Sequence, residues 1–125
     1  DQYSAREAKK LSDRGVMVSI GAHGQEEGLG SHWEMWSFVR GGMTPLEALK
    51  AATVTPATAL GYIRDIGTIE KGKLADLVIL DANPLDDIRN TDKIDRVMLN
   101  GRLYNAATMD EVVTGAGAKA KYYWE

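Results

Sequence analysis

The side chains best suited to chemistry lie in a polar, glycine-rich stretch near the amino end of the sequence. His23 follows Gly21 by two residues, and a run of polar side chains comes directly after it, at Gln25, Glu26 and Glu27. Imidazole gains and loses protons near neutral pH, so a histidine in such a loop is a candidate acid or base. If the chain carries chemistry, we expect it in this loop.

A short apolar segment must position this loop. Val16–Ile20 contains four apolar residues and one serine, and Gly15 and Gly21 bracket it. Apolar, largely β-branched runs of this length between glycines are typical of a strand buried on both faces. Proteins of the α/β class usually place their functional residues where such a strand opens onto a loop. The pattern therefore predicts a buried strand over 16–20 with the site after it.

Helices are predicted on both sides of this segment. Residues 3–14 show a weak apolar stripe, and Gly15 is suited to end that helix. Residues 32–41 predict a second helix that is apolar on nearly all sides, with Ser31 as its N-cap and Glu34 closing a capping box.

Two further helices are predicted from their amino-terminal signals. Thr44, Pro45 and Glu47 have the types and spacing of a capping box with proline at the first helical position. Thr55-Pro56 begins another short helix in the same way, and Gly61 ends it.

The last part of the chain is predicted to form strands. Residues 76–80 read as one strand. Residues 95–99 and 102–104 flank Asn100-Gly101, a dipeptide that favours a type I′ hairpin turn because both positions take positive φ. A short helix is expected over 108–113.

Composition narrows the class of protein. The chain has 125 residues, 44% of them hydrophobic, which suits about one globular domain. The net charge of −3 and the scattered basic residues argue against nucleic-acid or membrane-surface partners. With no cysteine, disulfides and thiolate metal sites are excluded, and both the cytoplasm and the periplasm remain open as compartments.

Several stretches within residues 15–104 resemble a known family. They read GVMVSIGAHG, GGMTPLEALKAATVTPATALGY, IGTIEKGKLADLVILDANPLDDI and VMLNGRLY. In this order and spacing they are similar to the carboxyl-terminal part of the amidohydrolase superfamily, in its imidazolonepropionase-like and prolidase-like branch.

The resemblance implies a fold. It places the chain in the α/β class, as about the last third of a (β/α)₈ TIM barrel that carries a small β-sandwich. Val16–Ile20 would be the eighth barrel strand, and residues 1–65 the end of the barrel. Residues 66–107 would supply sandwich strands, and 108–125 a carboxyl-terminal helix and tail. Since the sequence begins with Asp1, we expect an amino end that has been cut.

The resemblance also implies a metal centre. Family members bind one or two divalent ions, and we expect zinc in the complete enzyme. The chain has two histidines and lacks the family's His-x-His pair, so most ligands must lie elsewhere. Where the family has a metal-binding aspartate after the eighth strand, this chain has His23. A neutral imidazole can ligate zinc or act as a base, so His23 is predicted as both catalytic residue and metal ligand. This departure puts the usual carboxylate-base mechanism in doubt.

The same residues have plainer interpretations. The His23 ring could instead hydrogen-bond a loop carbonyl. Gln25 and His32 are candidates for substrate binding, although a solvated loop would explain Gln25 and a structural role would explain His32.

These observations predict a metal-dependent hydrolase of carbon–nitrogen bonds in amides, cyclic amides or dipeptides, which uses a metal-activated water. Its partners would be a small-molecule or short-peptide substrate and further copies of itself in a homo-oligomer. The 125-residue chain alone is expected to be inactive because most metal ligands are missing. The alternative is an inactive fragment or scaffold module that folds by self-association.

Overall fold

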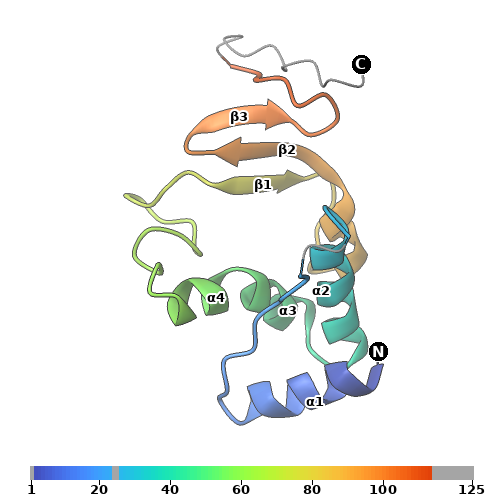
Figure 1. Cartoon of the computed structure of the whole chain (residues 1–125). Coiled ribbons are helices and arrows are strands. Elements are labelled where there is room, and N and C mark those ends of the chain that lie inside the picture. Colours follow the sequence, from blue (N-terminus) through green and yellow to red (C-terminus); the bar gives the residue numbers. More distant parts are fainter. Residues whose placement is uncertain (1, 24–25, 114–125) are drawn as a thin grey trace.

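The computed structural model describes residues 2–23 and 26–113. Four helices gather at one end of the molecule and an antiparallel sheet stands at the other (Figure 1). The elements are α1 (Gln2–Asp13), α2 (Gly30–Arg40), α3 (Pro45–Ala52), α4 (Val54–Ala59), β1 (Leu77–Leu80), the 3₁₀ helix η1 (Ile88–Asp92), β2 (Ile94–Leu99) and β3 (Arg102–Asn105). No helix in these two ranges is long and apolar enough to cross a membrane.

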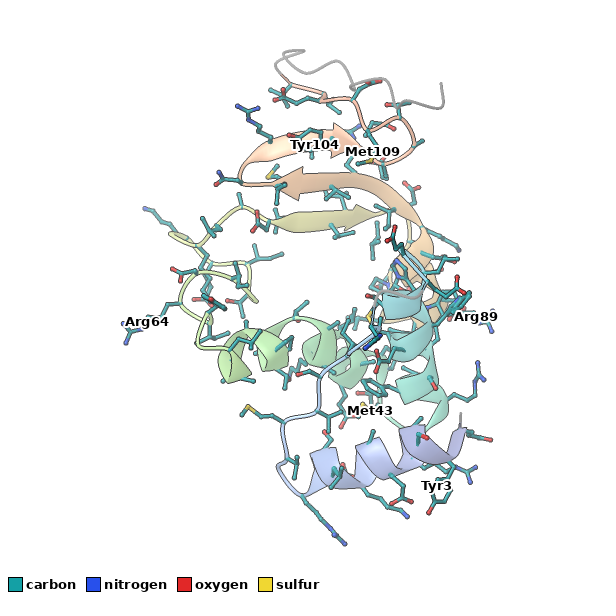
Figure 2. The ribbon with its side chains drawn as sticks, in the orientation of Figure 1. Tyr3, Met43, Arg64, Arg89, Tyr104 and Met109 are labelled. Carbon is teal, nitrogen blue, oxygen red and sulfur yellow. The ribbon has the colours of Figure 1, made fainter. Side chains whose placement is uncertain are left out.

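The hydrophobic core lies among the helices. Its buried members come from α2, from α3 with the turn before it, and from η1: Met35, Phe38, Met43, Ala48, Ala51 and Ile88. Figure 2 shows Met43 at the level between α1 and the helices above it. The core therefore packs α2 and α3 against each other.

A close backbone contact joins α1 to the end of α2. A Cβ atom added at Gly41 would lie only 2.5 Å from the backbone carbonyl carbon of Ala5. Only glycine allows this approach. The predicted helix over 3–14 is confirmed, and Gly15 follows it with a φ of 82°, the left-handed conformation expected after a helix end.

The capping signals of the next two helices differ in outcome. The box at α3 is confirmed, because the Thr44 hydroxyl accepts from the Glu47 backbone and the Glu47 carboxylate accepts from the Thr44 backbone. The box predicted at α2 is wrong. Leu29 stands at the cap position with no side-chain hydrogen bond, and Ser31 lies inside the helix. The Glu34 carboxylate binds a different backbone amide, described below.

The remaining helix and the sheet follow the predictions closely. Helix α4 includes Thr55-Pro56 but begins one residue earlier, at Val54. The sheet order is β1-β2-β3, with Val97 opposite Val78 on one side and Tyr104 on the other. Asn100 and Gly101 have φ values of 48° and 79°, as the predicted type I′ turn requires.

The predicted buried strand over 16–20 is not formed. The segment is extended, but Val16 and Met17 are exposed. Its backbone is bonded to helical residues, with the Val16 amide donating to Leu11 and the Ile20 amide to Ala51. A strand needs a neighbour for its hydrogen-bond ladder. No strand of the described ranges pairs with this segment, which explains the difference.

The short helix predicted over 108–113 is also absent. The Asn105 side chain accepts from the amides of Ala107 and Thr108, which makes a tight turn. The chain then passes through Met109 in a left-handed conformation and forms a bridge between Glu111 and Tyr104. Side-chain bonding to nearby amides competes with helix formation in this way. The predicted tail beyond 113 lies outside the described residues.

Candidate functional site

His23 lies at the end of the extended segment, beside the amino end of α2. Its backbone is left-handed, with a φ of 57°, and the residue is exposed. A non-glycine residue in this conformation is uncommon. The exposed imidazole is free of the core and open to a reacting molecule. Gln25 lies outside the described residues, so its predicted role in substrate binding stays a prediction.

Hydrogen bonds from two helices hold the backbone that leads into His23. The Ile20 amide donates to the carbonyl of Ala51 in α3 at 3.0 Å. The next amide, that of Gly21, donates to Oε2 of Glu34 in α2 at 2.7 Å. Two consecutive residues are therefore fixed to two different helices.

A third contact follows at Ala22. A Cβ atom added at Gly30 would lie 3.1 Å from the Ala22 Cβ and 3.5 Å from the Ala22 carbonyl oxygen. Glycine at the start of α2 thus lets the backbone of Ala22 approach closely. Ala22, which lies just before the loop, and Gly30, at the start of α2, are therefore close together.

Helix α3, which holds Ile20, begins at a well-formed cap. The backbone N–H of Thr44, and after it the Thr44 hydroxyl and Lys9, hold the pKa of the Glu47 carboxyl below its usual value. The Thr44 amide lies 2.6 Å from Glu47 Oε2. The charged carboxylate at the helix start also suits the helix dipole.

His32 lies in a different environment from His23. Its ring is tilted against that of Trp36, with centroids 6.5 Å apart, and its Nδ1 atom is buried without a hydrogen-bond partner in the described residues. The Trp36 indole donates to the carbonyl of Ile88 in η1 at 3.0 Å. The Arg89 guanidinium lies 5.3 Å from the centre of the same indole. His32 thus packs against Trp36 within α2, and Trp36 in turn joins α2 to η1.

The predicted metal ligands do not assemble in this part of the protein. Within residues 2–23 and 26–113, no three histidine, cysteine, aspartate or glutamate side chains gather closely enough to hold a metal ion. His23 and His32 are not joined by carboxylates into one centre. The described residues alone therefore do not fit a zinc site, which needs at least three protein ligands.

Sequence reasoning missed one residue of this site. Glu34 was predicted to close a capping box, but its carboxylate holds Gly21, thirteen residues away. Local spacing gives no signal for such a contact. The only hint is that Glu34 is acidic on an otherwise largely apolar helix.

Comparison with known proteins gives the family. A model of the amidohydrolase family matches residues 4–104. The imidazolonepropionase of Thermoplasma acidophilum is 40% identical over 85 residues, which are 66% of this chain and 21% of that protein. The ochratoxinase of Aspergillus niger is 37% identical over 76 residues, which are 60% of this chain and 16% of that protein.

Solved structures agree with this result. A Xaa-Pro dipeptidase with methionine bound in its active site superposes with a TM-score of 0.74 at 32% identity, over 82% of this chain and 25% of that one. Molinate hydrolase superposes with a TM-score of 0.65 at 29% identity, over 80% of this chain and 21% of that one. The chain thus spans about a sixth to a quarter of the length of these relatives. The resemblance noted in the sequence is confirmed, and the chain belongs to the amidohydrolase family.

Proposed function

We propose that the whole protein hydrolyses a carbon–nitrogen bond in an amide, a cyclic amide or a dipeptide. The family match over residues 4–104 carries this proposal. The likeness to a Xaa-Pro dipeptidase and to molinate hydrolase supports a hydrolytic reaction.

His23 is the proposed catalytic residue. Its neutral imidazole takes a proton from water while the water oxygen bonds to the substrate carbonyl carbon. The carbon–nitrogen bond then breaks, and the imidazole returns the proton to the departing nitrogen. The exposure of His23 and its place at the end of an anchored backbone support this role.

We also propose that the whole protein binds a divalent metal ion, with zinc as the first candidate. His23 is the ligand that this chain would contribute. Because the described residues gather no group of three ligands, they do not fit the centre by themselves, and the remaining ligands would lie elsewhere in the protein.

The extended segment supports the barrel part of the proposal. Val16–Ile20 is apolar and extended, and in residues 2–23 and 26–113 no strand pairs with it. In the whole protein it would be the last barrel strand, and β1 to β3 would belong to a small sandwich. His32 packs against Trp36, which supports the structural alternative for that histidine. A contact of His32 with substrate stays part of the proposal.

The proposal is tested by measuring amine release in the whole protein. N-acyl amino acids, cyclic amides and Xaa-Pro dipeptides serve as substrates, before and after dialysis against a chelator. We expect turnover of at least one class, loss of turnover on dialysis, and recovery when zinc is restored. A folded protein that hydrolyses none of the three with added zinc would contradict the proposal and favour the inactive scaffold.

A further inference from the structure

We infer that Glu34 is a positioning residue for the reaction, because its carboxylate holds the backbone from which His23 projects. This inference rests on the proposed role of His23. It assigns to Glu34 a task that its place in the sequence, three residues after Ser31, does not suggest.

The hydrogen bond to Glu34 lies just beyond the extended segment. In the proposed barrel, residues 16–20 would pair with neighbouring strands, whereas the backbone at Gly21 is held by a side chain of α2. The bond from the Gly21 amide to Glu34 Oε2, at 2.7 Å, is a hydrogen bond to a charged acceptor. Such bonds are shorter and stronger than those between neutral groups.

The Glu34 side chain stands on a helix that packs into the hydrophobic core. Glu34 precedes Met35 in α2, and both Met35 and Phe38 are buried in the core. A carboxylate on such a helix has a well-defined position. A site is held most accurately when its supporting groups stand on packed helices or strands.

Glu34 acts together with the close contact at Gly30. The carboxylate holds Gly21, and Ala22 rests against Gly30, where an added Cβ would come within 3.1 Å of the Ala22 methyl group. Immediately after these two residues the chain turns through His23 at a φ of 57°. A left-handed residue persists where its surroundings determine the backbone. Glu34 and Gly30 supply those surroundings.

The experiment measures kcat, KM and amide hydrogen exchange in the whole protein, with a substrate that the wild-type protein hydrolyses in the test of the proposed function. Glu34→Ala should lower kcat by about 10²-fold, the effect of misplacing a catalytic group by about 1 Å, while KM changes little. Exchange of the Gly21 amide should become faster. Glu34→Gln keeps an oxygen acceptor of the same reach, so it should restore most of the rate and the slow exchange.

Glu47→Ala is the matched control. It removes another carboxylate that accepts a backbone amide, at 2.6 Å, but at the start of α3. It should lower stability and leave kcat and the exchange of Gly21 unchanged. Gly30→Ala provides a second variant that does not touch the carboxylate, and it should lower kcat by displacing Ala22.

The outcomes separate the inference from the proposed function. Wild-type kcat in Glu34→Ala, with a strong loss in His23→Ala, would overturn the inference alone. Equal losses in Glu34→Gln and Glu34→Ala would overturn the role of the carboxylate oxygen as acceptor. Wild-type kcat in His23→Ala would overturn the proposed role of His23, and the inference with it. Should Glu34→Ala fail to fold, Glu34→Asp takes its place, because the shorter side chain withdraws the oxygen from the Gly21 amide: slow Gly21 exchange with wild-type kcat in that variant would overturn the inference.

Discussion

Two extended apolar segments, 16–20 and β1, have similar sequences and different structures. β1 pairs along its length with β2, whereas in the described ranges no strand pairs with residues 16–20. Exposure does not separate them. Val16 and Met17 are 50% and 59% exposed, and Val78 and Ile79 of β1 are 58% and 38% exposed. The difference is the backbone ladder, so an apolar pattern predicts an extended chain while the neighbour decides whether it becomes a strand.

The two segments therefore depend on different supports. The sheet is stabilised by its own ladder and by the turn at Asn100-Gly101. The segment that leads to His23 is held by α2 and α3, through Glu34 and Ala51. Changes that remove these two contacts should consequently reach the candidate site, and changes in the hairpin should not.

The largest expected effect concerns the unpaired segment. Because its backbone lacks a strand partner among the described residues and the side chains of Val16 and Met17 are exposed, the 125-residue chain should self-associate. The double variant Val16→Lys/Met17→Lys should shift it toward monomer in sedimentation velocity, whereas Val78→Lys, a similarly exposed residue in a paired strand, should not. A wild-type chain that stays monomeric at high concentration would contradict this contrast.

The next effect lies in the helical layer. Gly41→Ala should lower the free energy of unfolding by about 2 kcal/mol, because the new methyl group overlaps the backbone of Ala5 and forces α1 away from α2. Chemical denaturation measures this. Gly21→Ala is the matched control, since a Cβ there meets nothing within 4 Å. Equal losses of unfolding free energy in the two variants would contradict the tight packing of α1 against α2 at Gly41.

The hairpin turn gives a smaller effect. Gly101→Ala places a Cβ at a φ of 79°, which should lower the free energy of unfolding by about 1 kcal/mol. Gly101→Asn should lose less, because asparagine tolerates the left-handed region. Neither change should alter the environment of His23, measured from its imidazole resonances by NMR. A shift of those resonances would show that the two regions are coupled.

The smallest effect is the pH dependence from Glu47. The backbone N–H of Thr44 lowers the pKa of this carboxyl below its ordinary value of 4.5. A carboxyl with a lowered pKa in the folded state stabilises the protein above its unfolded pKa, and this contribution is lost as the pH falls through the folded pKa. Glu47→Gln should flatten the decline of stability below about pH 4.5 in denaturation curves. If stability declines at low pH in Glu47→Gln as it does in the wild type, other carboxyl groups cause the decline.

The predictions that succeeded depend on residues close together in the sequence. Thr44 and Glu47 cap α3 within one helical turn, and Asn100-Gly101 determines the hairpin with two adjacent residues. Their physical causes are local, so their types and spacing are enough.

The predictions that failed depend on partners that the local pattern does not contain. Glu34 bonds Gly21, thirteen residues before it, in place of the nearby cap. Asn105 holds the amides that would have begun the helix over 108–113. The position of the candidate site, in the loop after residue 20, was predicted from the change from apolar to polar residues, but the contacts that hold it were not.

The central claim is that His23 carries the chemistry of the whole protein. The most direct test is kcat of His23→Ala on the hydrolysed substrate, with His32→Ala, whose ring packs against Trp36 in α2, measured beside it. We expect His23→Ala to lower kcat by about 10²- to 10⁴-fold, the usual contribution of a general acid–base residue. We expect His32→Ala to lower kcat far less. A kcat in His23→Ala equal to that of the wild type would contradict the account.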